Sequence, residues 1–233
     1  MPIRTLQLHT RPCRGPEVPV SERGTAVAPS ARVRMLAPVL ALALVSLSCG
    51  RPADARYGDR LFPLVPGAMW DYRTSDANGA VGARTVRVLA GEGGYLVLET
   101  RENGVVRRTW VEDAALVLAV REVETGPDDQ TIESFFEPGA LLGLGRADVN
   151  AGQVFERTWT EGPAGTRAEV TARWTVEATG VTLGADAGWF EDVVRIRRSE
   201  SDGAEATLWY APGVGLVRSE GDERLELVNW SLP

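Results

Sequence analysis

Lysine is absent from this chain of 233 residues, and all 25 of its basic residues are arginine. This absence excludes Schiff-base chemistry and the lysine of a phosphate-binding P-loop. Histidine occurs once, as His9, and cysteine twice, as Cys13 and Cys49. The segment after Cys49 therefore has no histidine-based catalytic triad, no zinc site built on histidine and no disulfide of its own. We expect no catalytic residue, no metal site and no cofactor.

Positive charge is also scarce, because 32 acidic residues outweigh the arginines and give a formal net charge of -7. From Cys49 to Pro233 the imbalance grows to 30 acidic residues against 19 arginines. Nucleic acids require a basic face to neutralise their phosphates. The composition thus predicts that nucleic acid is not a partner.

The N-terminal region predicts export. Residues Met35–Ser48 are almost wholly apolar and follow Arg32 and Arg34. At 14 residues the run is shorter than the roughly 20 needed to span a bilayer, and a basic flank before a short apolar core is typical of a secretory signal peptide. Cys49 follows directly, so the site resembles the lipobox of bacterial lipoproteins, in which this cysteine carries the lipid. Gly50 after the cysteine implies, by analogy with lipoprotein sorting, the outer membrane.

One alternative to lipid attachment at Cys49 remains open, and the start of translation is a separate open question. Ordinary cleavage within residues 46–48 or 53–55 would release a soluble periplasmic or secreted protein. Translation could also begin near Val27, Val33 or Met35, because residues 1–31 lack apolar periodicity. The expected organisation is a pre-segment and signal peptide over 1–48, a lipidated cysteine and tether over 49–59, and a β-rich envelope domain over 60–233.

The segment after residue 68 alternates short apolar and polar runs, with turn residues every 8–12 positions. This pattern predicts an all-β domain with little helix outside the signal peptide. We expect a single antiparallel β-sandwich or a curved half-barrel. The predicted strands lie at 68–74, 83–90, 95–102, 105–112, 115–124, 130–136, 153–160, 166–178, 189–199, 205–210, 215–220 and 224–231.

The clearest predicted hairpin spans Tyr95–Glu112, with Asn103-Gly104 as its two-residue turn. Its register sets Leu96, Leu98, Thr100 and Glu102 opposite Val111, Thr109, Arg107 and Val105. The leucines and Val111 indicate that this is the core-facing side. On the other side, Glu99 is expected to face Arg108 as a solvated pair contributing less than about 1 kcal/mol.

Tryptophan is the most conspicuous residue that is present, with all seven copies after Cys49. Trp110, Trp174 and Trp209 are candidates for an apolar ligand site, although packing in a β core is the more ordinary role of such residues. The apolar segment 134–145 does not alternate like a strand. It is interpreted as a connection over the end of the sheet or as a lid over a cavity.

Two longer stretches carry a family resemblance. Leu61–Tyr72 contains Pro-Leu-x-x-Gly-x-x-Trp-x-Tyr, and Trp209–Glu220 contains Tyr-Ala-Pro-Gly-Val-Gly-Leu-Val. These motifs resemble an uncharacterised family of bacterial envelope lipoproteins. The resemblance implies a fold similar to lipoprotein-carrier and lipocalin-like β proteins, and no established activity. Pro212, Gly213 and Gly215 would form the structural turn of the second motif, where positive φ favours glycine.

The predicted function is a non-enzymatic binding or assembly domain, held in the cell envelope by the lipid on Cys49. Its partners would be the membrane and an envelope protein or apolar ligand. One alternative is a carrier that shelters a lipid or another apolar ligand in a half-barrel cavity. A weaker alternative is a carbohydrate-active enzyme that uses carboxylates, since acids cluster at Asp128-Asp129, Glu133/Glu137, Glu191-Asp192 and Asp222-Glu223.

Overall fold

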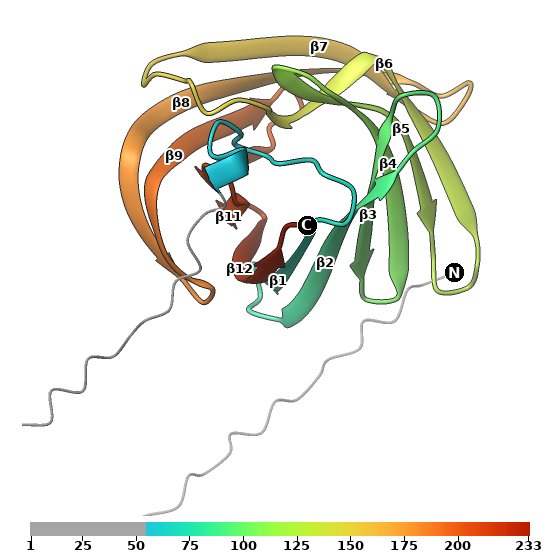
Figure 1. Ribbon diagram of the computed structural model, residues 1–233. Helices are drawn as coiled ribbons and strands as arrows, with labels where there is room; N and C mark the ends of the chain where they lie inside the picture. The colour runs from blue at the N-terminus through green and yellow to red at the C-terminus, as the bar shows by residue number, and fades with distance from the viewer. Residues whose placement is uncertain (1–54) are drawn as a thin grey trace, which may run out of the picture. The chain divides into compact units, whose positions relative to one another are not determined.

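The computed structural model describes residues 55–233, which form twelve β-strands and one short 3-10 helix. Figure 1 shows the strands arranged around a common axis. Their bounds are η1 Ala55–Tyr57, β1 Met69–Asp76, β2 Val81–Ala90, β3 Leu96–Glu102, β4 Val105–Asp113, β5 Leu116–Thr125, β6 Thr131–Leu144, β7 Val154–Gly162, β8 Ala168–Ala185, β9 Gly188–Glu200, β10 Glu205–Ala211, β11 Gly215–Glu220 and β12 Glu223–Ser231.

The sheet closes on itself as a twelve-stranded antiparallel barrel, in which each strand pairs with its neighbours in sequence and β1 pairs with β12. The prediction of a sandwich or half-barrel was therefore wrong, whereas the all-β class is confirmed. Closure follows from the β1–β12 ladder, which joins Met69 to Ser231 and Asp76 to Glu223. Closure gives every strand a partner on both sides, although the β6–β7 and β11–β12 ladders are only two or three residue pairs long.

The predicted Tyr95–Glu112 hairpin is confirmed residue by residue. Leu96 pairs with Val111 and Glu102 with Val105. Asn103 and Gly104 have φ values of 50° and 80°, the left-handed conformation that a two-residue turn of this kind requires. Leu98 and Val111 are buried, so the predicted core-facing side does face the barrel interior.

The apolar segment 134–145, which begins within the predicted strand 130–136, was interpreted as a connection or a lid, and this was wrong, because β6 continues to Leu144. The β5–β6 ladder is interrupted between Ala119 and Arg121, next to Pro138 and Gly139 on β6. Gly139 has a φ of 122°, and Pro138 has no N–H to donate to a ladder. A bulge absorbs both residues, and the strand continues on either side.

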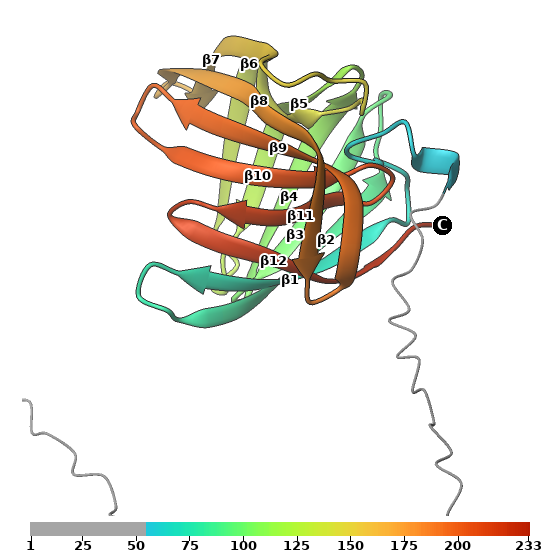
Figure 2. The same ribbon diagram turned by 90° about the vertical axis from the view of Figure 1, so that its left-hand side faces the viewer.

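The two ends of the barrel differ. One end is covered by the segment before β1, where Leu61 and Leu64 are buried; Figure 1 looks along the barrel and shows this segment crossing its opening. The C-terminus lies at the same end (Figure 2), where the Arg56 guanidinium donates a 2.9 Å hydrogen bond to the carbonyl of Pro233. We call this the plugged end. Within residues 55–233, no helix is long and apolar enough to cross a membrane.

The plugged half of the interior is packed with side chains. Trp70, Trp174, Ile196 and Leu227 are each less than 2% exposed, so no water-sized space adjoins them. The Trp70 indole donates a 2.6 Å hydrogen bond to the carbonyl of Val214. This pairing satisfies a buried polar group, which would otherwise be costly.

Candidate functional site

The opposite end of the barrel interior is polar. Near this rim, the inner face of a strand changes from buried apolar side chains to charged ones. On β9, Arg198 lies two residues after buried Ile196, and on β7, Glu161 lies two residues after buried Trp159. We call nine of the ionisable residues on the inner face near this rim the polar mouth. They are Arg84, Glu102, Arg107, Glu122, Glu124, Glu161, Arg198, Glu200 and Glu223.

Strand direction explains why these residues meet. In an antiparallel barrel of consecutive strands, odd-numbered strands end and even-numbered strands begin at one rim. Glu102, Glu124, Glu161 and Glu200 lie at or near the ends of odd strands, whereas Arg84 lies near the start of an even one. The eight members of the mouth that form ion pairs have 12% to 45% of their side-chain surface exposed, so water reaches this end.

One group of charges links three strands. The Arg84 guanidinium on β2 lies 2.5 Å from Glu102 on β3 and 2.5 Å from Glu223 on β12. Because β12 is the last strand and β2 the second, this arginine spans the β1–β12 junction where the barrel closes. Ion pairs with this degree of exposure contribute little stability individually. Their effect is to hold the carboxylates in place at the rim.

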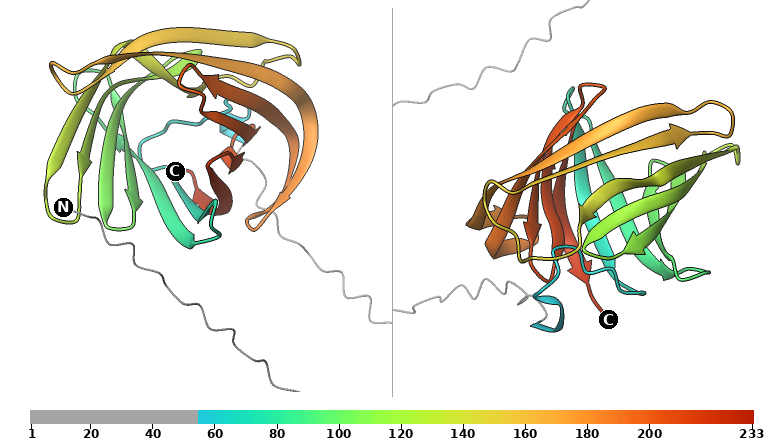
Figure 3. Two further views of the ribbon diagram at one scale, coloured as in Figure 1. Left: turned by 180° about the vertical axis from the view of Figure 1, so that it is seen from behind. Right: turned by 90° about the horizontal axis from the view of Figure 1, so that it is seen from above.

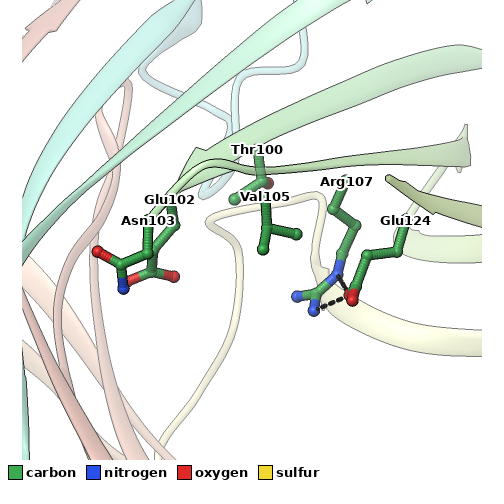
Figure 4. A pocket seen from close by; sticks show the side chains of 6 residues that line it. All are labelled: Thr100, Glu102, Asn103, Val105, Arg107 and Glu124. Carbon is green, nitrogen blue, oxygen red and sulfur yellow. Dashed lines mark hydrogen bonds and ion pairs between the residues drawn. The ribbon is translucent and has the colours of Figure 1, made fainter. Parts of the chain in front are cut away.

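A second group lies on β4 and β5. The Arg107 guanidinium contacts Glu124 at 2.6 Å and Glu122 at 3.3 Å, and Figure 4 shows it beside Glu124. The Thr109 hydroxyl donates a 3.0 Å hydrogen bond to Glu122. A pocket of about 180 Å³ opens here, lined by Thr100, Glu102, Asn103, Val105, Arg107 and Glu124.

Glu122 has the most distinctive electrostatics of the mouth. Burial raises the pKa of its carboxyl, the Arg107 charge and the Thr109 hydrogen bond lower it, and the charges of Glu124 and Glu161 raise it again, with a net upward shift. The charged form of Glu122 is therefore disfavoured mainly because its carboxylate is partly removed from water, and the neighbouring carboxylates of Glu124 and Glu161 add to the effect.

The third group lies across β7 and β9. The Trp159 indole donates a 2.7 Å hydrogen bond to Glu161, and Arg198 forms an ion pair with Glu200. A pocket of about 170 Å³ lies between Arg198 and Glu223. Over the whole mouth, six carboxylates face three arginines, so the rim is acidic.

A larger pocket, of about 460 Å³, lies at the plugged end beside the segment that covers it. Its lining mixes charge and apolar surface from Arg60, Leu144, Arg146, Asp148 and Phe155, among others. Arg60 is fixed by a two-point contact with Asp113, and its carbonyl accepts a 2.8 Å hydrogen bond from the Gly213 amide. These contacts attach the chain before β1 to the barrel.

The three predicted tryptophans do not form one site. Trp174 is buried on the inner face of β8. Trp110 lies on the opposite face of β4 from buried Val111, with the Arg121 guanidinium 4.4 Å from its ring centroid. Trp209 alternates with buried Leu208 on β10.

The predicted turn is present, with φ of 73° at Gly213, after Pro212, and 112° at Gly215. Cys49 lies outside the described residues.

The predicted acidic clusters are scattered and do not face one another as a pair. Glu133 pairs with Arg121, Glu137 pairs with Arg167, and Glu223 joins the mouth through Arg84. Asp128-Asp129 and Asp222 lie in turns, and Glu191-Asp192 lie exposed on β9. Within residues 55–233, no three His, Cys, Asp or Glu side chains are grouped so that they could hold a metal ion.

Sequence reasoning missed the mouth as a site, although one signal was present. The predicted register already placed Glu102 and Arg107 on the core-facing side of their hairpin, and the structure confirms that pairing. Charged residues on a core-facing side indicate that this side meets water at one end. Glu122 and Glu124 repeat the signal on β5.

No protein-family model matches the chain, and no curated protein sequence is significantly similar to it. Among solved structures, it is similar to a crystal structure described as that of a "putative lipoprotein" from Parabacteroides distasonis. That likeness has a TM-score of 0.42 at 15% sequence identity and covers 74% of this chain and 99% of the other. Similarity at this level defines no function for this chain.

Proposed function

We propose that this protein is a lipid-anchored lipoprotein of the bacterial envelope whose barrel is a non-enzymatic binding or assembly module. The observation that carries the proposal is the difference between the two ends of the barrel. One end is closed by Leu61 and Leu64 and leads towards Cys49, whereas the other presents a polar, water-accessible mouth.

The geometry supports an orientation relative to the membrane. Cys49 precedes the first described residue, Ala55, by six residues, which span at most about 20 Å when extended. A lipid on Cys49 would hold the plugged end near the bilayer and leave the mouth free for a partner. Gly50 favours the outer membrane as the anchoring membrane, by the analogy with lipoprotein sorting.

The excess of carboxylates in the mouth favours a partner that is neutral or basic at its contact surface. It also disfavours nucleic acid, whose phosphates would be repelled. The arginines of the mouth are occupied by Glu102, Glu124 and Glu200, among others, which leaves few of them for an acidic partner.

The carrier alternative requires an apolar cavity. The interior beside Trp70, Trp174 and Leu227 is filled, which counts against a lipid within that part of the barrel. The pocket at Arg60 and Arg146 has the volume of a small-ligand site, but its lining carries charges from both arginines and Asp148. A carbohydrate-active enzyme would need two carboxylates facing across a cleft. The carboxylates of the mouth are instead engaged by arginine, threonine or tryptophan.

Anchoring is tested by expressing the full chain in a Gram-negative host with radiolabelled palmitate. We expect label on the wild type and its loss, with release from the membrane fraction, in Cys49→Ser. Label that persists in Cys49→Ser, or wild-type protein that is soluble and unlabelled, would contradict the anchor.

The binding role is tested with a photo-crosslinking amino acid at Asp222, in the β11–β12 turn beside the mouth. The matched control carries it at Glu92, an exposed turn residue at the other end. We expect one defined adduct when the photo-crosslinking amino acid replaces Asp222. An excess of the Cys49→Ser chain without this amino acid should compete for the partner and abolish the adduct. Equal adducts at both positions, or none at Asp222, would refute the mouth as the contact surface.

A further inference from the structure

The ladder between β6 and β7 is short, and the two strands separate towards the plugged end. They pair only over residues 135–137 of β6, near the mouth, and the other residues of these two described strands do not pair with each other. The connection over residues 145–153 joins the strands at the plugged end (Figure 3). The Arg157 guanidinium bridges the point of separation, because it donates hydrogen bonds of 2.6 and 3.1 Å to the carbonyls of Gly139 and Pro138.

The pocket of about 460 Å³ lies where the two strands have separated. Its apolar lining includes Leu144 at the end of β6, Phe155 at the start of β7 and Val149 between them. These three side chains belong to, or pack against, the core cluster that contains Trp174, so the apolar wall of the pocket is firmly supported. A cavity of this size with an apolar wall and a few polar groups is typical of a site for a small ligand.

Two charged side chains of opposite sign line this pocket without a partner. Within residues 55–233, the side chains of Arg146 and Asp148 form no hydrogen bond or ion pair, either with each other or with another residue. Most arginines in this part of the chain do pair with a carboxylate. The other charged residue of the lining, Arg60, is neutralised by Asp113. The pocket therefore offers one cation and one anion, both exposed, to a ligand.

The backbone fixes the positions from which these two side chains extend. Arg146 forms a β-bridge with Arg60, which precedes β1. Two residues further on, the Val149 amide donates a 2.9 Å hydrogen bond to the carbonyl of Ala147, and this tight turn encloses Asp148. Because the backbone is already ordered, a ligand that binds here does not have to order it.

We propose that this pocket binds a small zwitterion with an apolar body, namely a free α-amino acid with an aliphatic side chain. The Arg146 guanidinium binds the carboxylate, the Asp148 carboxylate accepts hydrogen bonds from the ammonium group, and the apolar side chain of the ligand lies against Leu144 and Phe155. A ligand with one charge of each sign leaves neither charge of the pocket unpaired, whereas a simple carboxylate is repelled by Asp148. The mouth and the anchor at Cys49 take no part in this site, so the proposed function stands or falls separately.

Isothermal titration calorimetry of the full Cys49→Ser chain tests the site with L-leucine and with two analogues that each lack one charge. Isocaproate lacks the ammonium group, and isopentylamine lacks the carboxylate. We expect L-leucine to bind with one-to-one stoichiometry and each analogue to bind about tenfold more weakly, because one charge of the pocket then stays unpaired. Equal affinity for the three compounds, or no binding of L-leucine at about 10 mM, would overturn the proposal.

Single variants assign the two charges to their roles. Arg146→Gln should weaken L-leucine and isocaproate alike, by about tenfold, because both lose the partner of their carboxylate. Asp148→Asn should weaken L-leucine but not isocaproate, which has no ammonium group to lose a partner. Arg87→Gln is the matched control, since Arg87 is also exposed and has no ion pair within the described residues, but lies on β2 away from the pocket. Unchanged binding in Arg146→Gln or Asp148→Asn, or weaker binding in Arg87→Gln, would refute the site.

Discussion

Glu99 offers the sharpest test of the electrostatics of the barrel wall. It lies on the outward side of β3 yet is only 4% exposed, and its carboxylate accepts hydrogen bonds from Arg101 at 2.8 Å and Arg108 at 3.0 Å. The expectation of a solvated Glu99–Arg108 pair was therefore wrong on the glutamate side. Burial alone would raise the pKa of Glu99, but the two arginines lower it below the usual value.

The perturbation is Glu99→Gln, which keeps the shape and removes the charge. Each hydrogen bond to a charged group is worth about 1.5–3 kcal/mol. The loss is smaller than the sum of two such bonds. Arg101 and Arg108 are more than half exposed, so water hydrates them in the variant, and the glutamine oxygen still accepts one hydrogen bond. The expected loss in the free energy of unfolding is therefore about 1–2 kcal/mol at pH 7.

The sign of the pH dependence follows from the lowered pKa. The stabilisation by Glu99 is fully present above the unfolded-state pKa, near 4.5, and is lost as pH falls through the folded-state pKa. The difference in the free energy of unfolding between wild type and Glu99→Gln should therefore disappear at acid pH. Urea unfolding of the Cys49→Ser chain, followed by tryptophan fluorescence across this pH range, measures it.

Glu133→Gln is the matched control, because Glu133 contacts one arginine, Arg121, and is 42% exposed. Its effect should stay below about 0.5 kcal/mol at every pH. The assignment of the stabilisation to this carboxylate would be refuted if wild type and Glu99→Gln had the same free energy of unfolding at pH 7. It would also be refuted if their difference persisted unchanged at acid pH.

Three further predictions concern the mouth and the core. Glu122→Gln should stabilise the fold at pH 8 and have no effect below the unfolded-state pKa, because the folded state raises the pKa of Glu122; the same urea titration measures this. Trp70→Phe should cost about 1–3 kcal/mol in urea unfolding, since the buried Val214 carbonyl loses its donor. Gly215→Ala should cost about 1–3 kcal/mol and lower the melting temperature, because φ is 112° and the new Cβ would lie 3.1 Å from the Trp70 indole nitrogen.

Local signals were sufficient to identify the strands. Each of the twelve predicted strands overlaps one in the structure, because alternation and turn residues such as Asn103-Gly104 act over a few residues. The prediction of strand bounds was wrong on β6, where a bulge interrupts the strand. At Pro138 and Gly139 the local pattern resembles a loop, and only the neighbouring β5 shows that pairing resumes.

Closure of the barrel could not be predicted in this way. It depends on the pairing of Trp70 with Trp230 and of Asp76 with Glu223, residues about 150 positions apart. Period-2 alternation is the same in a sandwich, a half-barrel and a closed barrel. The mouth was missed for the same reason, since Arg84 and Glu223 become neighbours only after β1 and β12 pair.

The even number of strands connects the fold to the proposed function. In a barrel of consecutive antiparallel strands, an even count places the start of the first strand and the end of the last at one rim. The hydrogen bond from Arg56 to the Pro233 carbonyl shows the two ends meeting there. The charged residues that end the odd strands must then collect at the other rim. In the proposed function, a tether that enters at Ala55 would therefore leave the polar mouth at the end of the barrel farthest from the anchor, where a partner would reach it.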